Sequence, residues 1–190
     1  MRNAVFVHGK PPRERYENPS EPKPHAANWF PWITEQLVEQ NIAVAVPEMP
    51  KPYFPVFDDW KEVFEQHSIG PQTALVGHSA GAEFILRWLS QNEHATAERV
   101  VLLAPYKDYD GKYNGFSDYQ LDTELVERVG KLTILHSSDD DTPIIRRSYE
   151  LAEQLTGAQH NVLRGYGHFR IGHNMTSPAL PPLLVALQEK

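Results

Sequence analysis

The chain of 190 residues contains no cysteine, which excludes a disulfide-stapled scaffold, a thiol nucleophile and any zinc or iron–sulfur site built on cysteine ligands. Any catalytic chemistry must therefore use oxygen or nitrogen atoms. The chain also lacks an apolar run close to the roughly 20 residues that a membrane-spanning helix needs. Residues 1–9 are too short and too soon interrupted to form a secretory signal. We therefore expect a cytoplasmic protein.

A surplus of positive charge is missing as well. Lys and Arg number 18 against 25 Asp and Glu, so the formal net charge is −7. This balance lacks the basic footprint of a protein that binds nucleic acid or an anionic membrane. With 41% hydrophobic and 23% charged residues, the composition suits one globular domain over residues 1–190 and leaves the oligomeric state open.

Six short apolar runs rich in Val, Leu and Ile are typical of strands buried on both faces of a parallel sheet. They cover residues 3–8, 42–47, 73–78, 99–104, 132–136 and 160–163. The spacing of apolar residues predicts amphipathic helices over residues 28–40, 57–66, 80–92, 121–129, 144–156 and 180–188. This alternation indicates an α/β fold with a doubly wound, mostly parallel sheet and helices on both faces. A ligand site is then expected beyond the carboxyl ends of the strands.

The connecting segments include two proline-rich loops, one within residues 11–24 and one within residues 47–55. Such clusters mark loops and not linkers between domains. Residues 107–120 are rich in Tyr, Gly and Asp and are read as an irregular insertion that could form a small lid.

The sharpest chemical signal is the motif Gly77-His78-Ser79-Ala80-Gly81, which follows an apolar run and precedes a helical pattern. A Gly-x-Ser-x-Gly between a strand and a helix is the nucleophile elbow, a tight turn that presents the serine hydroxyl. The glycines allow the strand and helix to approach closely, and the helix start directs backbone donors at the reacting oxygen. Ser79 is therefore the predicted nucleophile, and the alternative is a glycine-flanked turn with a solvated serine.

A serine hydroxyl needs a histidine base that a carboxylate orients. In this architecture the chain order is nucleophile, acid, histidine. An acidic turn after the fifth apolar run offers Asp139, Asp140 and Asp141, any of which could instead cap the next helix. Asp140 is favoured by its spacing from the end of the strand and from the start of the helix, and Asp139 is the main alternative.

His168 is the predicted base because it lies in a glycine-rich turn directly after the last apolar run. From that turn its imidazole can reach over the nucleophile. The competing histidines are His173, His8, His78 and His136. His173 lies further along an irregular stretch.

Backbone N–H groups should stabilise the oxyanion that develops during acyl transfer. The amide of Ala80, directly after the nucleophile, is the first predicted donor. The second is the amide of Lys10, in the loop that follows the first apolar run and its His8-Gly9 end.

Together these residues resemble the α/β-hydrolase superfamily, and more narrowly its small cofactor-free serine hydrolases related to retinoblastoma-binding protein. The likeness spans nearly the whole chain and includes its compact size and the motifs His8-Gly9, Trp29-Phe30-Pro31-Trp32, Met49-Pro50, Gly77-His78-Ser79-Ala80-Gly81, Ser138-Asp139-Asp140 and Gly167-His168-Phe169. It implies six parallel strands in the order 2-1-3-4-5-6 and a triad of Ser79, Asp140 and His168. This chain departs from the family in the order Pro143-Ile144 after the acid and in a longer loop at residues 10–27.

The implied reaction is hydrolysis of a small ester, thioester or amide through an acyl-enzyme, as in a carboxylesterase, without cofactor or metal. Aromatic residues near the strand exits are predicted to line the substrate pocket, although each could equally be core or surface packing: Trp29, Tyr53, Phe54, Tyr106 and Phe169. Other readings are a catalytically weak binding protein of the same fold, a transferase and a metal-dependent hydrolase. The nine histidines disfavour the last because they do not cluster at ligand spacings.

Overall fold

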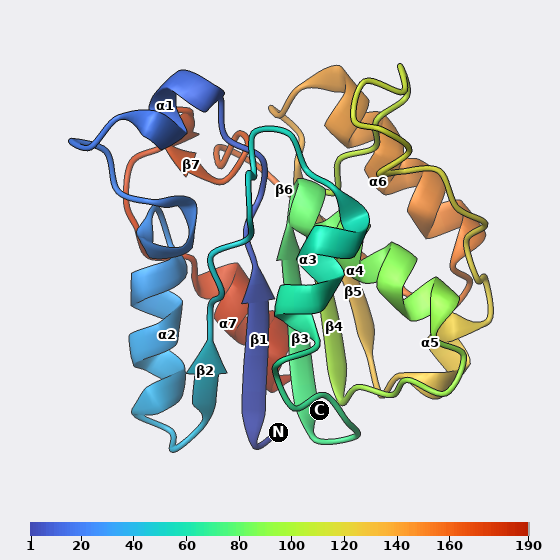
Figure 1. Ribbon diagram of the computed structural model, residues 1–190. Coiled ribbons are helices and arrows are strands. Elements are labelled where there is room, and N and C mark those ends of the chain that lie inside the picture. Colours follow the sequence, from blue (N-terminus) through green and yellow to red (C-terminus); the bar gives the residue numbers. More distant parts are fainter. Residues whose placement is uncertain (190) are drawn as a thin grey trace.

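A computed structural model describes residues 1–189 and shows a six-stranded, wholly parallel sheet in the order β2-β1-β3-β4-β5-β6 (Figure 1). The strands are β1 (Asn3–Val7), β2 (Ala43–Ala45), β3 (Thr73–His78), β4 (Arg99–Leu103), β5 (Leu132–Ser137) and β6 (Gln159–Leu163). The predicted sheet and its strand order are therefore confirmed.

Successive side chains of the central strands enter two separate apolar cores, one on each face of the sheet. In β1, Val5 and Val7 belong to one core, and Ala4 and Phe6 belong to the other. All four side chains are at most 1% exposed. Because successive strand residues point to opposite faces, a continuous apolar run is what a strand covered on both sides requires.

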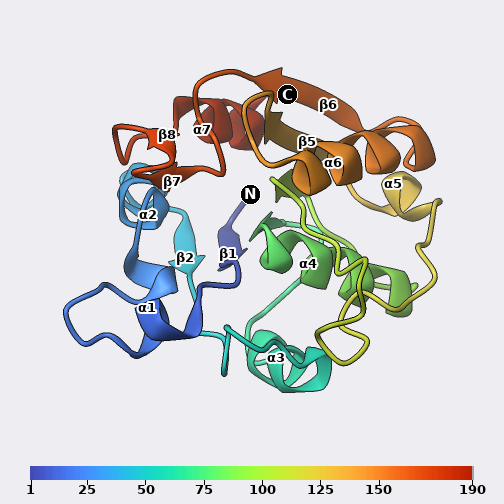
Figure 2. The same cartoon turned by 90° about the horizontal axis from the view of Figure 1, so that it is seen from above.

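Two helices cover one face of the sheet and four cover the other (Figure 2). The first pair is α2 (Phe30–Val38) and α7 (Pro181–Gln188). The opposite layer contains α3 (Phe57–Phe64), α4 (Ala80–Gln91), α5 (Leu125–Arg128) and α6 (Thr142–Gln154). The helix expected over residues 121–129 is reduced to α5, because Arg128 turns back to bind Asp122 and the carbonyl of Leu89.

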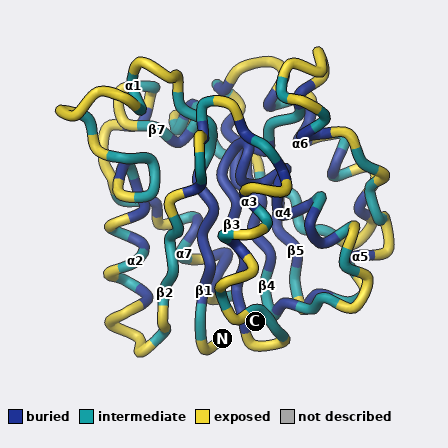
Figure 3. Tube along the Cα trace, viewed as in Figure 1, coloured by how far each residue is buried: buried dark blue, intermediate teal, exposed yellow. Residues whose placement is uncertain are grey.

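Burial on both faces holds for the central strands but not for the two edges. Figure 3 shows the contrast between the buried β1 and the less buried edge strand β2. Residues of β2 are exposed or half-buried, and β6 includes the exposed Val162. The expectation that all six runs are fully buried is wrong for these two strands, because an edge strand has a neighbour on one side only. Within residues 1–189 no helix is both long and apolar enough to cross a membrane.

Short elements that the apolar pattern did not predict lie beyond the carboxyl ends of the strands. The proline-rich loop at residues 10–27 contains α1 (Arg13–Glu17) and a 3-10 turn, η1 (Pro24–Ala26). Two-residue strands β7 (Arg170–Ile171) and β8 (Asn174–Met175) follow β6. The two regions meet where the backbone N–H of Ile171 donates to Oδ1 of Asn28 at 3.1 Å.

Residues 107–120 form a series of turns without helix or strand. The segment is anchored by Phe116, whose ring is 1% exposed and packs on Trp60 at a centroid distance of 5.2 Å. Arg87 also donates to the backbone carbonyl of Gly115 at 2.6 Å. These contacts hold the insertion onto the sheet core, and its action as a lid stays a prediction.

Candidate active site

Ser79 occupies the sharp turn between the end of β3 and the start of α4. Its backbone angles are φ 56° and ψ −118°, which a non-glycine residue rarely adopts. The neighbouring glycines explain how the turn closes. A Cβ on Gly77 would lie 2.4 Å from Cα of Ala82, and one on Gly81 would lie 2.2 Å from the carbonyl oxygen of Val7. Both positions therefore require glycine, as the nucleophile elbow predicts.

The three residues predicted as nucleophile, acid and base form a chain of hydrogen-bond contacts in which His168 touches both Ser79 and Asp140. Nε2 of His168 is 3.0 Å from Oγ of Ser79. Nδ1 of the same ring is 2.9 Å and 3.1 Å from the two carboxylate oxygens of Asp140. A carboxylate can only accept, so the ring carries its proton on Nδ1 and leaves Nε2 free to accept the serine proton. Each residue comes from the carboxyl end of a different strand.

The adjacent carboxylate of Asp139 binds other groups than His168, and this difference distinguishes the two candidates for the acid. It accepts from the backbone N–H of Gly165 at 3.0 Å and from the side-chain amide of Asn174 at 2.7 Å. The hydroxyl of Ser137 also donates to it. These hydrogen bonds, led by that of Ser137, lower the pKa of Asp139 to about 2. Asp139 thus ties the loop before His168 to the end of β5.

The histidines that compete with His168 as the base have their own partners. His173 accepts from the backbone N–H of His168 at 3.1 Å through Nδ1. Nε2 of His78 donates to the carbonyl oxygen of His168 at 3.0 Å. Both side chains therefore support the turn that carries His168. His136 instead pairs with His160 at 3.0 Å.

His8 is buried behind the loop that follows β1. Its Nε2 accepts from the backbone N–H of Met49 at 3.0 Å, so the proton is on Nδ1, which donates to the carbonyl oxygen of Gly9 at 2.9 Å. Burial lowers the pKa of His8 to about 4, so the ring is neutral at pH 7. In a trans peptide the C=O and N–H point in opposite directions. Holding the carbonyl of Gly9 therefore directs the N–H of Lys10 away from His8.

Both predicted oxyanion donors lie next to the serine. Gly9 and Lys10 line the pocket beside Ser79, and a Cβ on Gly9 would be 2.9 Å from Cβ of Ser79. Ala80 is the first residue of α4. Within residues 1–189 neither the Lys10 nor the Ala80 N–H donates to another protein group. Both amides therefore lack a protein acceptor in this part of the chain, and their role as oxyanion donors stays a prediction.

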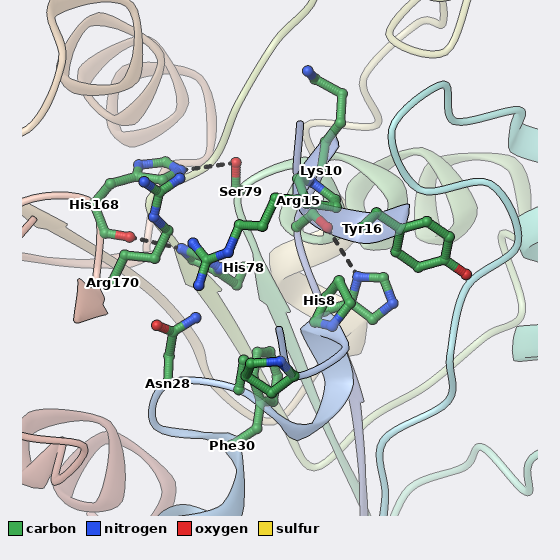
Figure 4. A pocket seen from close by; sticks show the side chains of 15 residues that line it. His8, Lys10, Arg15, Tyr16, Asn28, Phe30, His78, Ser79, His168 and Arg170 are labelled. Carbon is green, nitrogen blue, oxygen red and sulfur yellow. Dashed lines mark hydrogen bonds between the residues drawn. The ribbon is translucent and has the colours of Figure 1, made fainter. Parts of the chain in front are cut away.

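A pocket opens directly beside Ser79 and His168 (Figure 4). It encloses about 550 Å³ of empty space, part of which is open to solvent. One wall comes from residues 8–30 and the other from His78, Ser79, His168 and Arg170.

The aromatic residues predicted to line the pocket do not do so. Trp29 and Phe169 are 0% exposed and belong to the core between the sheet and helices α2 and α7. Tyr53 packs on Tyr16, and Phe54 and Tyr106 pack on Tyr113. None of the five predicted aromatics lies in the wall of this pocket, because Trp29 and Phe169 fill the core and the other three, of which Phe54 is exposed, pack on neighbouring tyrosines.

Three polar residues of the pocket were not expected from the sequence: Arg15, Asn28 and Arg170. Arg15 and Asn28 lie in the long loop before α2, and Arg170 follows the base by two positions. No spacing rule marks such loop residues. For Arg15 the only signal was the greater length of the 10–27 loop, and for Arg170 there was none. Across residues 1–189, no group of three or more His, Asp or Glu side chains is placed to hold a metal ion.

The elbow, the three-residue hydrogen-bond chain and the parallel sheet define a hydrolase of the serine type on an α/β-hydrolase fold. The model of the serine hydrolase family matches residues 20–180, and the chain belongs to that family. It is similar to YdeN of Bacillus subtilis (strain 168), with 28% identity over 163 residues, which cover 79% of this chain and 82% of YdeN.

Solved structures show the same fold. The crystal structure of the ydeN gene product from B. subtilis aligns with a TM-score of 0.79 and 25% identity, covering 98% of this chain and 97% of that one. A YdeN-like protein from Pectobacterium atrosepticum aligns with a TM-score of 0.63 and 14% identity over 98% of this chain and 90% of its own. Est1E from Butyrivibrio proteoclasticus aligns with a TM-score of 0.59 and 13% identity, covering 90% of this chain and 82% of that one.

Proposed function

We propose that this serine hydrolase cleaves a small carboxylic ester through an acyl-enzyme on Ser79, with His168 as general base and Asp140 as the group that orients it. The observation that carries the proposal is the 3.0 Å contact of Nε2 of His168 with Oγ of Ser79. Thioesters and amides pass through the same intermediate and form the wider substrate class. A closer relation to retinoblastoma-binding protein rests on the sequence motifs alone.

In the first half-reaction Oγ of Ser79 forms a bond to the carbonyl carbon of the ester while its proton moves to Nε2 of His168. Asp140 stabilises the resulting imidazolium through Nδ1–H. The negative charge develops on the former carbonyl oxygen, which the N–H groups of Ala80 and Lys10 would bind. The carbon–oxygen bond to the alcohol then breaks, and the alcohol leaves with the proton from Nε2.

In the second half-reaction a water molecule attacks the acyl-serine. Nε2 of His168 accepts a proton from this water, and the same two amides stabilise the second oxyanion. Collapse of this intermediate releases the carboxylic acid and returns the proton to Oγ of Ser79. The residues involved end in their starting protonation states, so the cycle needs no further reactant.

The test is covalent labelling with a fluorophosphonate, which reacts with activated serines, followed by intact-mass analysis. The parent should gain one adduct, Ser79→Ala should gain none, and His168→Ala should react at least about a hundredfold more slowly because the base contributes roughly 10²–10⁴-fold. Matched controls are Ser68→Ala and His94→Ala, which change exposed residues outside the site and should label like the parent.

Folding of each variant is checked by circular dichroism before labelling. A folded parent that stays unlabelled, or a Ser79→Ala protein that labels at the parent rate, contradicts the proposal. The first of these outcomes would favour a binding protein that keeps the hydrolase fold without turnover.

A further inference from the structure

The pocket beside Ser79 is cationic. Three of its lining residues, Lys10, Arg15 and Arg170, are cationic, and none of the lining residues, all within the described range 1–189, is Asp or Glu. This composition contrasts with the chain as a whole, whose net charge is −7. A cationic pocket beside Ser79 in an acidic protein suggests that the pocket binds a negatively charged group.

The three cations differ in how far other groups already engage them. The ammonium of Lys10 lies over the ring of Tyr113, 4.6 Å from its centroid, and so points out of the pocket. Nε of Arg15 contacts the carboxylate of Glu21 at 3.3 Å, and this pair is partly exposed. The other N–H groups of the Arg15 guanidinium therefore remain for another partner.

Arg170 has no such partner. Its Nε is buried, and no protein atom within residues 1–189 accepts a hydrogen bond from it. Burial lowers the pKa of Arg170, the charge of Arg15 lowers it further, and only the exposed Asp141 acts in the opposite direction. A partly buried guanidinium without a counter-charge is costly, since desolvation is not offset by a hydrogen-bonded anion.

The two arginines approach the same space from different segments. Arg15 belongs to α1 and Arg170 to β7, and Figure 4 shows both side chains directed into the pocket near His78 and His168. Guanidinium groups bind carboxylates through two parallel N–H···O bonds, a geometry that ammonium groups cannot offer. The pocket thus contains a donor set for an anion within reach of the nucleophile.

We propose that the substrate of Ser79 carries a free carboxylate, and that Arg170, assisted by Arg15, binds this group while the ester lies against Ser79. This inference rests on the proposed hydrolase function and deepens it by naming the substrate class. The carboxylate supplies the counter-charge that Arg170 lacks. Neutral esters of the same size leave that charge uncompensated and bind less well.

The kinetic test compares two esters that differ only in this charge: the 4-nitrophenyl monoester of adipic acid and the same compound with its free carboxyl capped as a methyl ester. The parent should prefer the anionic ester in kcat/KM by about tenfold or more, as expected for hydrogen bonds between charged groups. A second pair, 4-acetoxybenzoate and 4-acetoxybenzamide, carries the charge difference on the leaving alcohol and tests whether the carboxylate belongs to that part of the substrate instead.

Arg170→Met should reduce the preference to about one, Arg170→Lys should retain part of it, and Arg15→Met should weaken it. The matched control is Arg2→Met, which removes one exposed positive charge outside the pocket and should leave the preference unchanged. A preference that is absent from both substrate pairs in the parent overturns the proposal. So does a preference that Arg170→Met fully retains.

A binding measurement separates this inference from the proposed function. Monomethyl adipate and dimethyl adipate are titrated into folded Ser79→Ala, which cannot turn them over, and the dissociation constants are measured by NMR. If monomethyl adipate binds more tightly than dimethyl adipate, and adding Arg170→Met to Ser79→Ala removes this difference, the carboxylate site is supported even if fluorophosphonate labelling fails. Equal binding of the two esters, with labelling of Ser79 intact, refutes the carboxylate site alone.

Discussion

The carboxylate of Asp139 accepts a hydrogen bond from the backbone N–H of Gly165 at 3.0 Å, three residues before His168. The neighbouring carboxylate of Asp140 points instead to the imidazole of His168. Two adjacent residues of one chemical type thus have separate tasks, one in holding the loop and the other in orienting the proposed base.

We expect these two tasks to separate on mutation. Asp140→Asn should reduce kcat by about 10³–10⁴-fold with little change in stability, because the imidazole loses its orienting carboxylate. Asp139→Ala should lower the free energy of unfolding by about 2 kcal/mol, since several donors of the loop lose their acceptor. Ester turnover and urea unfolding measure the two effects.

The control for the acidic turn is Asp141→Asn, because Asp141 is exposed and contributes no side-chain cap to α6. It should resemble the parent in both assays. If Asp139→Ala abolished turnover at unchanged stability while Asp140→Asn stayed active, the assignment of the two aspartates would be reversed.

The glycines of the elbow should be intolerant of any side chain. Gly81→Ala should cost about 3 kcal/mol, because its Cβ would meet the backbone carbonyl of Val7 at 2.2 Å and neither backbone can move freely. Gly70→Ala is the matched control, since a Cβ there meets nothing within 4 Å. It should change stability by less than about 0.5 kcal/mol. Equal melting temperatures of the two variants would contradict the close approach of α4 to β1.

Buried neutral His8 makes stability depend on pH. The pKa of its ring is about 4 in the folded chain, below the ordinary value of 6.5. Between these two values the unfolded state binds a proton that the folded state does not, so stability falls as the pH falls, by about 1.4 kcal/mol per pH unit from this group. Above pH 6.5 this contribution is fully present and constant.

Urea unfolding of His8→Gln between pH 7.5 and 4.5 should show a shallower loss of stability than the parent. The exposed His94→Gln should keep the slope of the parent. An unchanged slope in His8→Gln would mean that His8 is not held neutral.

A fully buried ion pair joins α4 to α6. Nε and Nη2 of Arg147 lie 3.1 Å from the two carboxylate oxygens of Glu83, whose side chain is 0% exposed. Removing one partner leaves a buried charge uncompensated, so Arg147→Met should cost about 3–5 kcal/mol. The double variant Glu83→Leu with Arg147→Met should recover part of that loss.

The surface pair of Arg13 and Glu17 provides the comparison, since both side chains are at least half exposed. Arg13→Met should change the free energy of unfolding by less than about 1 kcal/mol. Chemical denaturation of the parent, the single variants Glu83→Leu and Arg147→Met, and the double variant measures the coupling. A double variant as unstable as the sum of its single changes would show that the two buried side chains act independently.

Much of the fold follows from local pattern. Continuous apolar runs identify strands covered on both faces, and the strand-turn-helix context of Ser79 identifies the elbow, because only glycine fits where β3 and α4 converge. The chain order of serine, aspartate and histidine then places Asp140 and His168 at neighbouring strand exits. Parallel strands bring their carboxyl ends to one edge, so this proximity follows from topology without knowledge of the loops.

The sequence by itself therefore determined the sheet, the elbow and the candidate triad residues of this protein. Only the tertiary structure decided which aspartate faces His168. Adjacent side chains point in different directions because of the local backbone angles, and the composition of the turn does not specify those angles. It also decided the pocket: Trp29 and Phe169 fill the core, and Arg15 and Arg170, far apart in the chain, line the cavity. Loops without periodicity meet through long-range packing, and no local pattern records where they meet.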